Sequence, residues 1–129
     1  LAANSLATST IVINQQRSWA NFLAREAMEA VLRVRAVAFT SLTPGIYHPV
    51  FTESGWSLSP GAEVLGEFTR TITLTSVMRQ LGCTVAVCDV VEGGGVVDEG
   101  TLKVKVVVDW DESGRDKSFS LSSLITYWR

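Results

Sequence analysis

The first 43 residues contain neither glycine nor proline, and this uninterrupted stretch constrains the fold more than any other feature of the chain. At about 100° per residue, the apolar side chains of residues 18–40 fall on one broad arc of a helix. The arc comprises Trp19, Phe22, Leu23, Ala27, Ala30, Val31, Val34, Val37 and Ala38. We therefore predict one continuous helix over residues 1–40, with this arc packed on a sheet.

The segment that follows, residues 41–66, is rich in residues that interrupt regular structure. They include Pro44, Pro49, Gly55 and Pro60. Because such residues favour turns, we predict a loop region with one or two short strands, lying against the helix through its aromatic side chains.

Beyond residue 66 the hydrophobic period changes to two, which is typical of strands with one buried face. Strands are predicted at residues 67–75, 101–110 and 118–128, and a turn at residues 111–114 joins the last two as an antiparallel hairpin. The order of helix, loop and strands indicates an α+β fold, in which the helix covers an antiparallel sheet of about three to five strands over residues 67–129. The 129 residues are expected to form one domain with a single core.

The composition excludes several classes of protein. Apolar residues make up 47% of the chain and charged residues 19%, which indicates a globular protein rather than a disordered one. The net charge is −2 and basic residues do not cluster, so no nucleic-acid partner is expected. No run of apolar residues reaches the 18 to 20 that would span a membrane.

Groups that could catalyse a reaction are sparse, and we expect neither an enzyme nor a cofactor. His48 is the single histidine and is interpreted as a surface or packing residue. The loop at residues 92–95 lacks the Lys-Ser/Thr pair of a phosphate-binding loop. Acidic residues near the predicted turn could hold calcium, but their spacing does not match an EF-hand, so a solvated turn is favoured. These residues are Asp109, Asp111, Glu112 and Asp116.

The four tryptophans are interpreted as core residues rather than as a binding platform. They are Trp19, Trp56, Trp110 and Trp128.

The two cysteines, Cys83 and Cys88, are too few to form a metal site without His48. In an oxidising compartment a disulfide between them is favoured over a metal. In a straight strand their α-carbons would lie about 16 Å apart, whereas a disulfide needs roughly 4.4 to 6.8 Å. The segment therefore either turns back around Val85 and Ala86 or leaves both thiols free.

Two charged residues interrupt otherwise apolar patterns. Glu26 lies inside the apolar arc of the helix, and Arg70 takes an inward position between Phe68 and Ile72. A buried unpaired charge is costly, whereas a paired and hydrogen-bonded one is tolerated. We therefore predict that Arg70 pairs with Glu26, or failing that with Glu29, unless Arg70 lies at the sheet edge and reaches water.

Three blocks taken together resemble a known family. The first is LAREAMEAVLRVR at residues 23–35; the second contains GIYHPVF, GWSLSPG and GEFTRTITLTSV over residues 45–77; the third is VDEGTLKVKVVVDW followed by SFSLSSLITYWR, ending at Arg129. In order and spacing they resemble the globular part of a type IV pilin-like protein, of the PilV-like (pilus modification) minor pilin kind. The resemblance covers roughly residues 17–129 and implies a single pilin-like domain over residues 1–129.

The chain departs from the family at its N-terminus. The family begins with a leader peptide and a hydrophobic half-helix, and here the chain starts at Leu1 with only a mildly apolar lead-in. We expect that the half-helix, which anchors the subunit in the membrane and packs in the filament, is missing.

The resemblance implies a structural subunit of a type IV pilus or related surface filament, which contributes to filament initiation, assembly or surface interaction. It implies anchoring in the cytoplasmic membrane before assembly, a final location on the cell surface, and contact with other pilin subunits through the N-terminal helix. Two alternatives are a pseudopilin of a type II secretion system and a pilus-tip adhesin or DNA-uptake receptor. A DNA receptor should carry a basic stripe, and only Lys103 and Lys105 share a strand face, beside Asp109.

Overall fold

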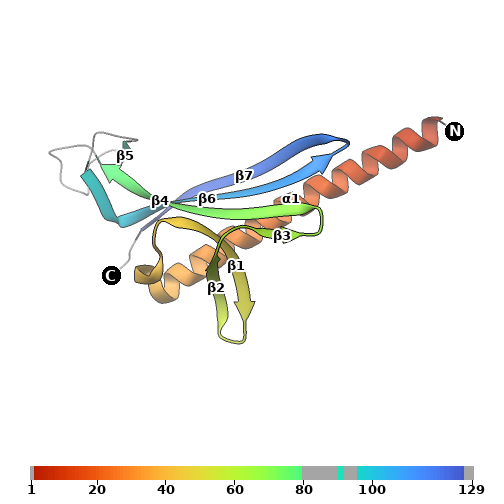
Figure 1. Cartoon of the computed structure of the whole chain (residues 1–129). Helices are drawn as coiled ribbons and strands as arrows, with labels where there is room; N and C mark the ends of the chain where they lie inside the picture. Colours follow the sequence, from red (N-terminus) through yellow and green to blue (C-terminus); the bar gives the residue numbers. More distant parts are fainter. Residues whose placement is uncertain (1, 80–89, 92–95, 127–129) are drawn as a thin grey trace.

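A single long helix, α1 (Ala2–Ala38), crosses one face of an antiparallel sheet and projects beyond the sheet at its N-terminal end (Figure 1). The structure is a computed structural model that describes residues 2–79, 90–91 and 96–126. The 37 residues of α1 correspond to about 55 Å of helix at 1.5 Å per residue. The prediction of one continuous N-terminal helix is confirmed.

The helix ends where its last carbonyl groups find partners. A short 3₁₀ turn, η1 (Phe39–Ser41), follows α1. The hydroxyl of Ser41 donates a hydrogen bond of 2.7 Å to the carbonyl of Ala38, and the amide of Leu42 donates one of 2.9 Å to the carbonyl of Phe39. These bonds satisfy groups that a helix end otherwise leaves unpaired.

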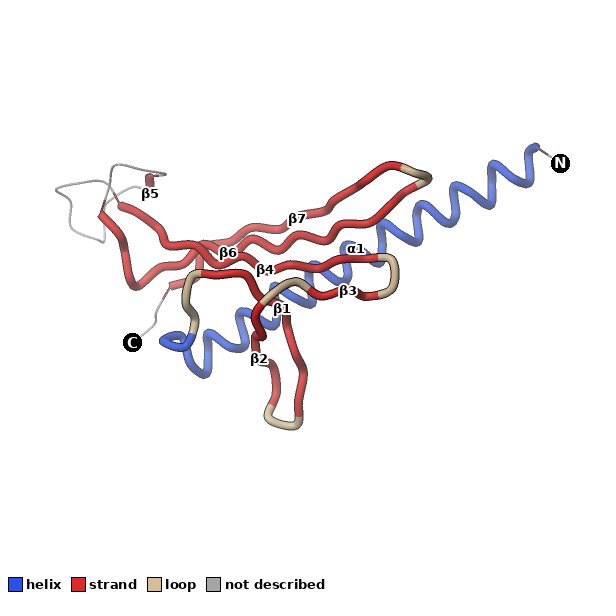
Figure 2. The backbone as a smooth tube through the Cα atoms, viewed as in Figure 1, coloured by secondary structure: helices blue, strands red, loops and turns tan. Residues whose placement is uncertain are grey.

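The sheet has the strand order β2-β1-β4-β6-β7, with two short strands, β3 and β5, also paired to β4 (Figure 2). All pairings are antiparallel. The strands are β1 (Gly45–Thr52), β2 (Gly55–Pro60), β3 (Glu63–Leu65), β4 (Phe68–Arg79), β5 (Val90–Val91), β6 (Val96–Glu112) and β7 (Arg115–Thr126). The predicted α+β class, a helix packed on an antiparallel sheet, is confirmed.

The prediction of a loop region with one or two short strands at residues 41–66 is wrong in its extent, because three strands, β1, β2 and β3, lie within it. They belong to the sheet, which therefore has seven strands in the described residues rather than about three to five. Apart from Pro49, the glycines and prolines of this region lie at the ends of strands or in the short connections between them. Pro49 lies inside β1, beyond the three residues by which β1 pairs with β4. On that side β1 has no ladder of hydrogen bonds that a missing amide could break.

The core lies between α1 and the inward faces of β4 and β6. Five inward side chains of β6 are buried: Leu102, Val104, Val106, Val108 and Trp110. The helix meets them with small side chains at Ala20, Ala24 and Ala27, which are fully buried. Alanine at these positions lets the helix backbone approach the sheet closely, and each fully buried Val, Leu or Ile contributes roughly 1.5–3 kcal/mol.

The predicted apolar arc of α1 is displaced from the face that the structure buries. Trp19 and Phe22 are 55% and 52% exposed, and Val37 is 89% exposed, whereas Ala20 and Ala24 are buried instead. At about 100° per residue the centre of the buried face is rotated by about 40° from that of the predicted arc. The large aromatic side chains biased the prediction, and the alanines that set the contact distance carry little hydrophobic signal.

The β6–β7 hairpin closes through a two-residue turn at Ser113 and Gly114, shorter than the predicted four-residue turn. Both residues have positive φ, 54° and 82°, as the tight turns that match the twist of a hairpin require. Serine adopts this conformation at a cost, whereas asparagine and glycine tolerate it.

We expect Ser113→Asn to stabilise the protein by about 0.5 kcal/mol, because asparagine is better suited to this turn position. Gly114→Ala should destabilise it by about 1 kcal/mol, because alanine is strained at this φ. Urea unfolding measures both changes. Ser120→Asn, on the exposed face of β7, is the control, and a similar gain for it would contradict the turn-specific explanation.

Candidate functional site

Arg70 is the centre of a buried ion-pair cluster that joins the helix to the sheet. Its side chain is 5% exposed. One guanidinium nitrogen donates to the carboxylate of Glu26 at 2.8 Å and to the backbone carbonyl of Leu23 at 3.1 Å. The Nε atom donates to the carboxylate of Glu63 at 2.7 Å. The guanidinium of Arg70 on β4 therefore binds two groups of α1 and one group of β3.

The pairing of Arg70 with Glu26 is the one expected from the sequence, and Glu29 instead bonds Arg33 at 3.0 Å on the helix surface. Sequence reasoning missed Glu63. That residue lies on β3 directly opposite Arg70 in the register of the two strands. Its segment belongs to the predicted loop region at residues 41–66, and a loop assigns no inward position to Glu63.

A second ion pair ties the helix to the far end of the β6–β7 hairpin. Arg17 donates to the two carboxylate oxygens of Glu112 at 2.8 and 3.2 Å. The side chain of Glu112 is 7% exposed, and the hydrogen bonds and charge of Arg17 lower its pKa from the ordinary value of 4.5, against the effect of burial. The same carboxylate raises the pKa of Arg17. Beside this pair, Gln16 donates to the carboxylate of Glu67 at 3.1 Å.

Trp19 and Phe22 form an exposed aromatic cluster on α1, which we call the aromatic knob. Their rings meet edge to face, with centroids 5.3 Å apart and planes inclined by 71°. Trp19 stands between two hollows: one of about 910 Å³ on the side of Val12, the other of about 400 Å³ over Leu65 and Phe68. Glu67 lines both hollows.

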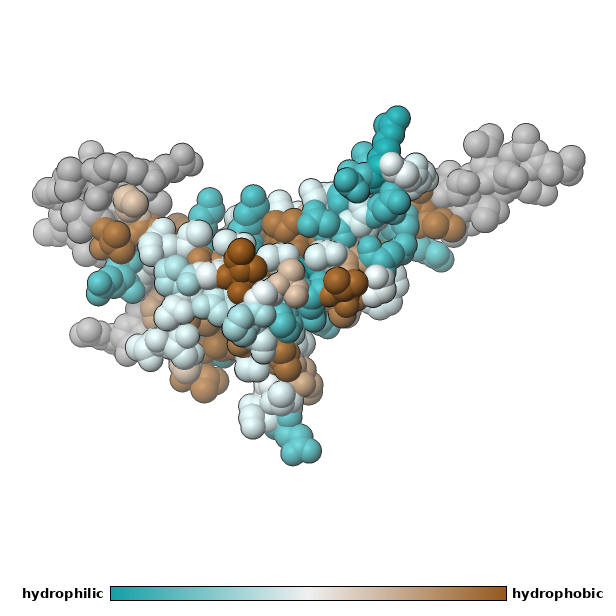
Figure 3. All heavy atoms as spheres, in the orientation of Figure 1, coloured by the Kyte–Doolittle hydropathy of each residue, from teal (hydrophilic) through white to brown (hydrophobic). Residues whose placement is uncertain are grey.

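A groove of about 690 Å³ lies at the other end of α1, between the helix and the β1–β2 hairpin; we call it the helix-end groove. Most of its lining is apolar and includes Val34, Val37, Tyr47, Phe51, Trp56 and Leu58. Arg33 also lines it. Figure 1 shows the β1–β2 hairpin standing away from the rest of the sheet on this side. Figure 3 shows hydrophobic residues on the surface of this region.

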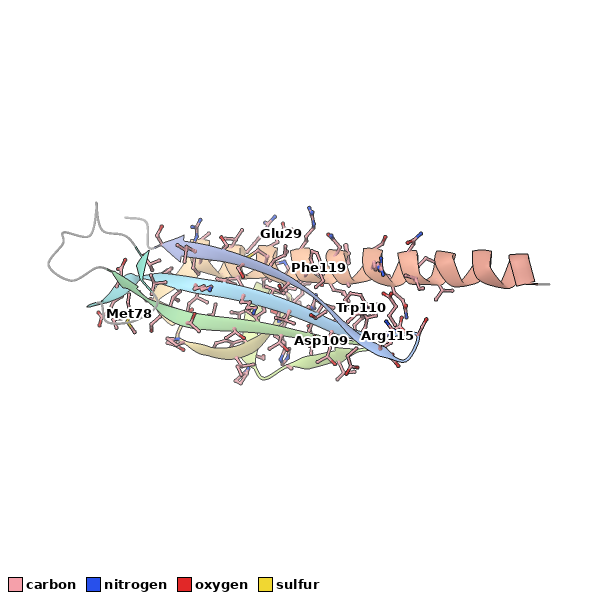
Figure 4. The ribbon with its side chains drawn as sticks, turned by 90° about the horizontal axis from the view of Figure 1, so that it is seen from above. Glu29, Met78, Asp109, Trp110, Arg115 and Phe119 are labelled. Atoms are coloured by element: carbon pink, nitrogen blue, oxygen red, sulfur yellow. The ribbon has the colours of Figure 1, made fainter. Side chains whose placement is uncertain are left out.

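The other residues singled out in the sequence have structural surroundings. His48 lies on β1, and its Nδ1 atom is 3.0 Å from the carbonyl oxygen of Gly61. Among the acidic residues near the turn, Glu112 faces inward to Arg17 while Asp109, Asp111 and Asp116 are exposed. Figure 4 places Asp109 beside Trp110 on β6 and Arg115 at the start of β7.

The prediction that the tryptophans are core residues holds for some of them and not for others. Trp110 is 7% exposed and belongs to the core. Trp56 is half-buried and packs against Phe51, with ring centroids 5.0 Å apart and planes inclined by 60°. The core interpretation of Trp19 is wrong, because the knob is exposed. Trp128, Cys83 and Cys88 lie outside the described residues, as does the glycine loop.

No family model, no curated protein and no solved structure matches the chain. Within the described residues, no group of three or more metal-ligating side chains comes together, and no helix there combines the length and apolarity needed to cross a bilayer.

Arg70→Ala should destabilise the protein by about 3 kcal/mol, because it leaves the carboxylates of Glu26 and Glu63 without their cation. Arg33→Ala is the matched control: its ion pair with Glu29 is exposed, and its loss should change the free energy of unfolding by no more than about 0.5 kcal/mol. Chemical denaturation measures both variants. Equal effects would show that the Arg70 cluster adds nothing beyond a surface pair.

Glu112 should make folding stability depend on pH below its ordinary pKa. Since its pKa is lowered in the folded state, its stabilising effect is complete above pH 4.5 and is lost as the pH falls through the folded-state pKa. The difference in stability between the unmodified protein and Glu112→Gln should therefore be constant above pH 4.5 and shrink below it. Denaturant unfolding at a series of pH values measures this, and a difference that persists unchanged at pH 2.5 would contradict it.

Proposed function

We propose that this chain is the globular part of a filament subunit, a minor pilin of a type IV pilus or a related surface filament. The observation that carries the proposal is the single helix that serves two purposes. Its C-terminal half packs on the sheet through buried alanines, and its N-terminal part continues as helix beyond the sheet (Figure 1). A subunit that assembles through one helix and displays a β domain needs this division.

The surface of the helix supports the same proposal. From Val12 to Trp19 the side chains of α1 are exposed or half-buried, so this part of the helix is open to other subunits. Aromatic residues are enriched at protein–protein interfaces, and the aromatic knob lies where α1 leaves the sheet. Within the described residues, the blocks of sequence that resemble the PilV-like family lie in α1, β1, β2, β4, β6 and β7.

The outer face of the sheet gives less support to DNA uptake. Lys103 and Lys105 are exposed on β6, and they are followed along the same face by Val107 and Asp109. None of the cross-strand neighbours of these lysines is basic: Thr73 and Ser122 flank Lys105, and Thr75 and Leu124 flank Lys103. Two lysines give a weak, strongly salt-dependent attraction to phosphates.

The filament proposal is tested in the parent organism by deleting the gene and restoring it with an epitope tag. We expect the tagged chain to co-purify with filaments sheared from the cell surface, and the deletion to reduce the number of filaments per cell. A pseudopilin would instead be required for secretion of exported proteins while surface pili remain. Normal filaments and normal secretion after deletion, with the tagged chain absent from the sheared fraction, would contradict both.

A further inference from the structure

The aromatic knob and the helix-end groove are two apolar surfaces that the described chain leaves uncovered. Trp19 and Phe22 of the knob are each about half exposed. In the groove, Val37 and Phe51 are 89% and 69% exposed. Large apolar side chains gathered at one place on a surface are typical of binding sites, whereas isolated ones need no explanation. In many interfaces a few large side chains, often aromatic, supply most of the binding free energy.

The two surfaces differ in shape in a complementary way. Trp19 forms a ridge between two hollows, whereas the groove is a half-enclosed depression bounded by the helix end and the β1–β2 hairpin. An aromatic pair in a groove lined by Phe51 and Trp56 could adopt the tilted ring contacts that aromatic groups prefer. The groove has a volume of about 690 Å³, and ligand pockets of this size hold groups much larger than one ring.

The charges beside Trp19 and beside the groove are opposite, whereas the Phe22 side of the knob is bordered by Arg17, which is paired with Glu112, and by Arg25. Glu67 lines both hollows next to Trp19, and Arg33 lines the groove. The partner of Glu67 within the chain is the neutral amide of Gln16, so its negative charge is not cancelled by that bond. Arg33 is paired with Glu29, four residues earlier on the helix, in an exposed ion pair. Such a pair contributes little free energy, so Arg33 can exchange Glu29 for another carboxylate at little cost. Opposite charges at the edges of two apolar surfaces favour their association and fix its orientation.

We propose that the aromatic knob of one copy of this chain binds in the helix-end groove of a second copy. A copy cannot fill its own groove, because Phe22 and Val37 are 15 residues apart on one straight helix, which is about 22 Å at 1.5 Å per residue. The contact joins unlike surfaces, so each bound pair retains one free knob and one free groove. Contacts of this kind continue into open chains unless the symmetry closes them.

This inference rests on the proposed filament function, because it names the partner and the surface by which neighbouring subunits would recognise each other. Two aromatic side chains bury too little surface for a stable dimer, which needs roughly 1,200–2,000 Å². We therefore expect weak self-association of the isolated chain, with a Kd on the order of 100 μM. In a filament, further contacts to the same neighbours would make such a weak interaction effective.

The test uses two variants that each lose one of the two surfaces. Trp19→Ala with Phe22→Ala removes the knob, and Val37→Glu places a carboxylate in the groove. All three side chains are more than half exposed, so both variants should fold. Val64→Glu is the matched control for Val37→Glu, since Val64 is 73% exposed on β3 and lines neither surface.

Sedimentation equilibrium at concentrations up to 1 mM gives the self-association of each protein. The unmodified chain and Val64→Glu should associate alike, and each of the other variants should associate at least tenfold more weakly. A mixture of the two variants should recover binding with an affinity close to that of the unmodified chain, because the mixture contains one intact knob and one intact groove. Isotope labelling of the knob-deficient chain should then show NMR shift changes at Phe51 and Trp56.

Three results would overturn the proposal: a strictly monomeric unmodified chain at 1 mM, variants that associate as the unmodified chain does, or a mixture that fails to bind. The last result would mean that the knob does not bind the groove, and that association joins two knobs or two grooves. A second pair of variants guards against local unfolding: Glu67→Arg and Arg33→Glu should each weaken association, and their mixture should restore it. If the knob and the groove do not bind each other, the filament proposal still stands on its own test, because a subunit can enter a filament through other surfaces.

Discussion

The fold depends on how one buried arginine is neutralised. Arg70 occupies an inward position of β4. The other inward residues beside it, Phe68, Ile72 and Leu74, are apolar and buried. An unpaired charge at such a position would prevent the helix from covering the sheet. One carboxylate oxygen of Glu26, one of Glu63 and the carbonyl oxygen of Leu23 are the three acceptors for the three guanidinium nitrogens. Because these acceptors come from α1 and β3, the charge is satisfied in one register of helix on sheet.

The second ion pair extends this register along the helix. Arg17 and Glu112 lie at the end of the sheet from which α1 projects. Between Arg17 and the Arg70 cluster, the contact is made by alanines and by Leu23. The helix is therefore fixed at two polar points with a closely packed apolar surface between them. This arrangement leaves the aromatic face of α1 turned away from the sheet.

The sequence was sufficient for the features that depend on periodicity. The absence of helix breakers predicted α1, and alternation predicted the buried faces of β4 and β6. Glu26 and Arg70 were paired in advance because each was an isolated charge in an apolar pattern. What failed was the orientation of α1 about its axis, since Trp19 and Phe22 outweigh alanine in any hydrophobic pattern. Prediction also failed between η1 and β4, where prolines and glycines suggested a loop.

Those failures are informative about the candidate site. Glu63 could not be found because its strand was hidden by turn residues, and the groove depends on the position of the β1–β2 hairpin, which has no local sequence signal. The exposed knob is a place where the pattern of the sequence and the packing of the single chain disagree. Such disagreements are expected where a surface is meant to meet a partner.

The central claim is that α1 is one helix with a packed half and a projecting half. Amide hydrogen exchange of the folded chain tests it most directly. The account predicts that the amides of residues 20–31 are protected as strongly as those of β4 and β6, because helix and sheet unfold together, while residues 2–12 exchange several orders of magnitude faster. Equal and rapid exchange along the whole of α1 would contradict it.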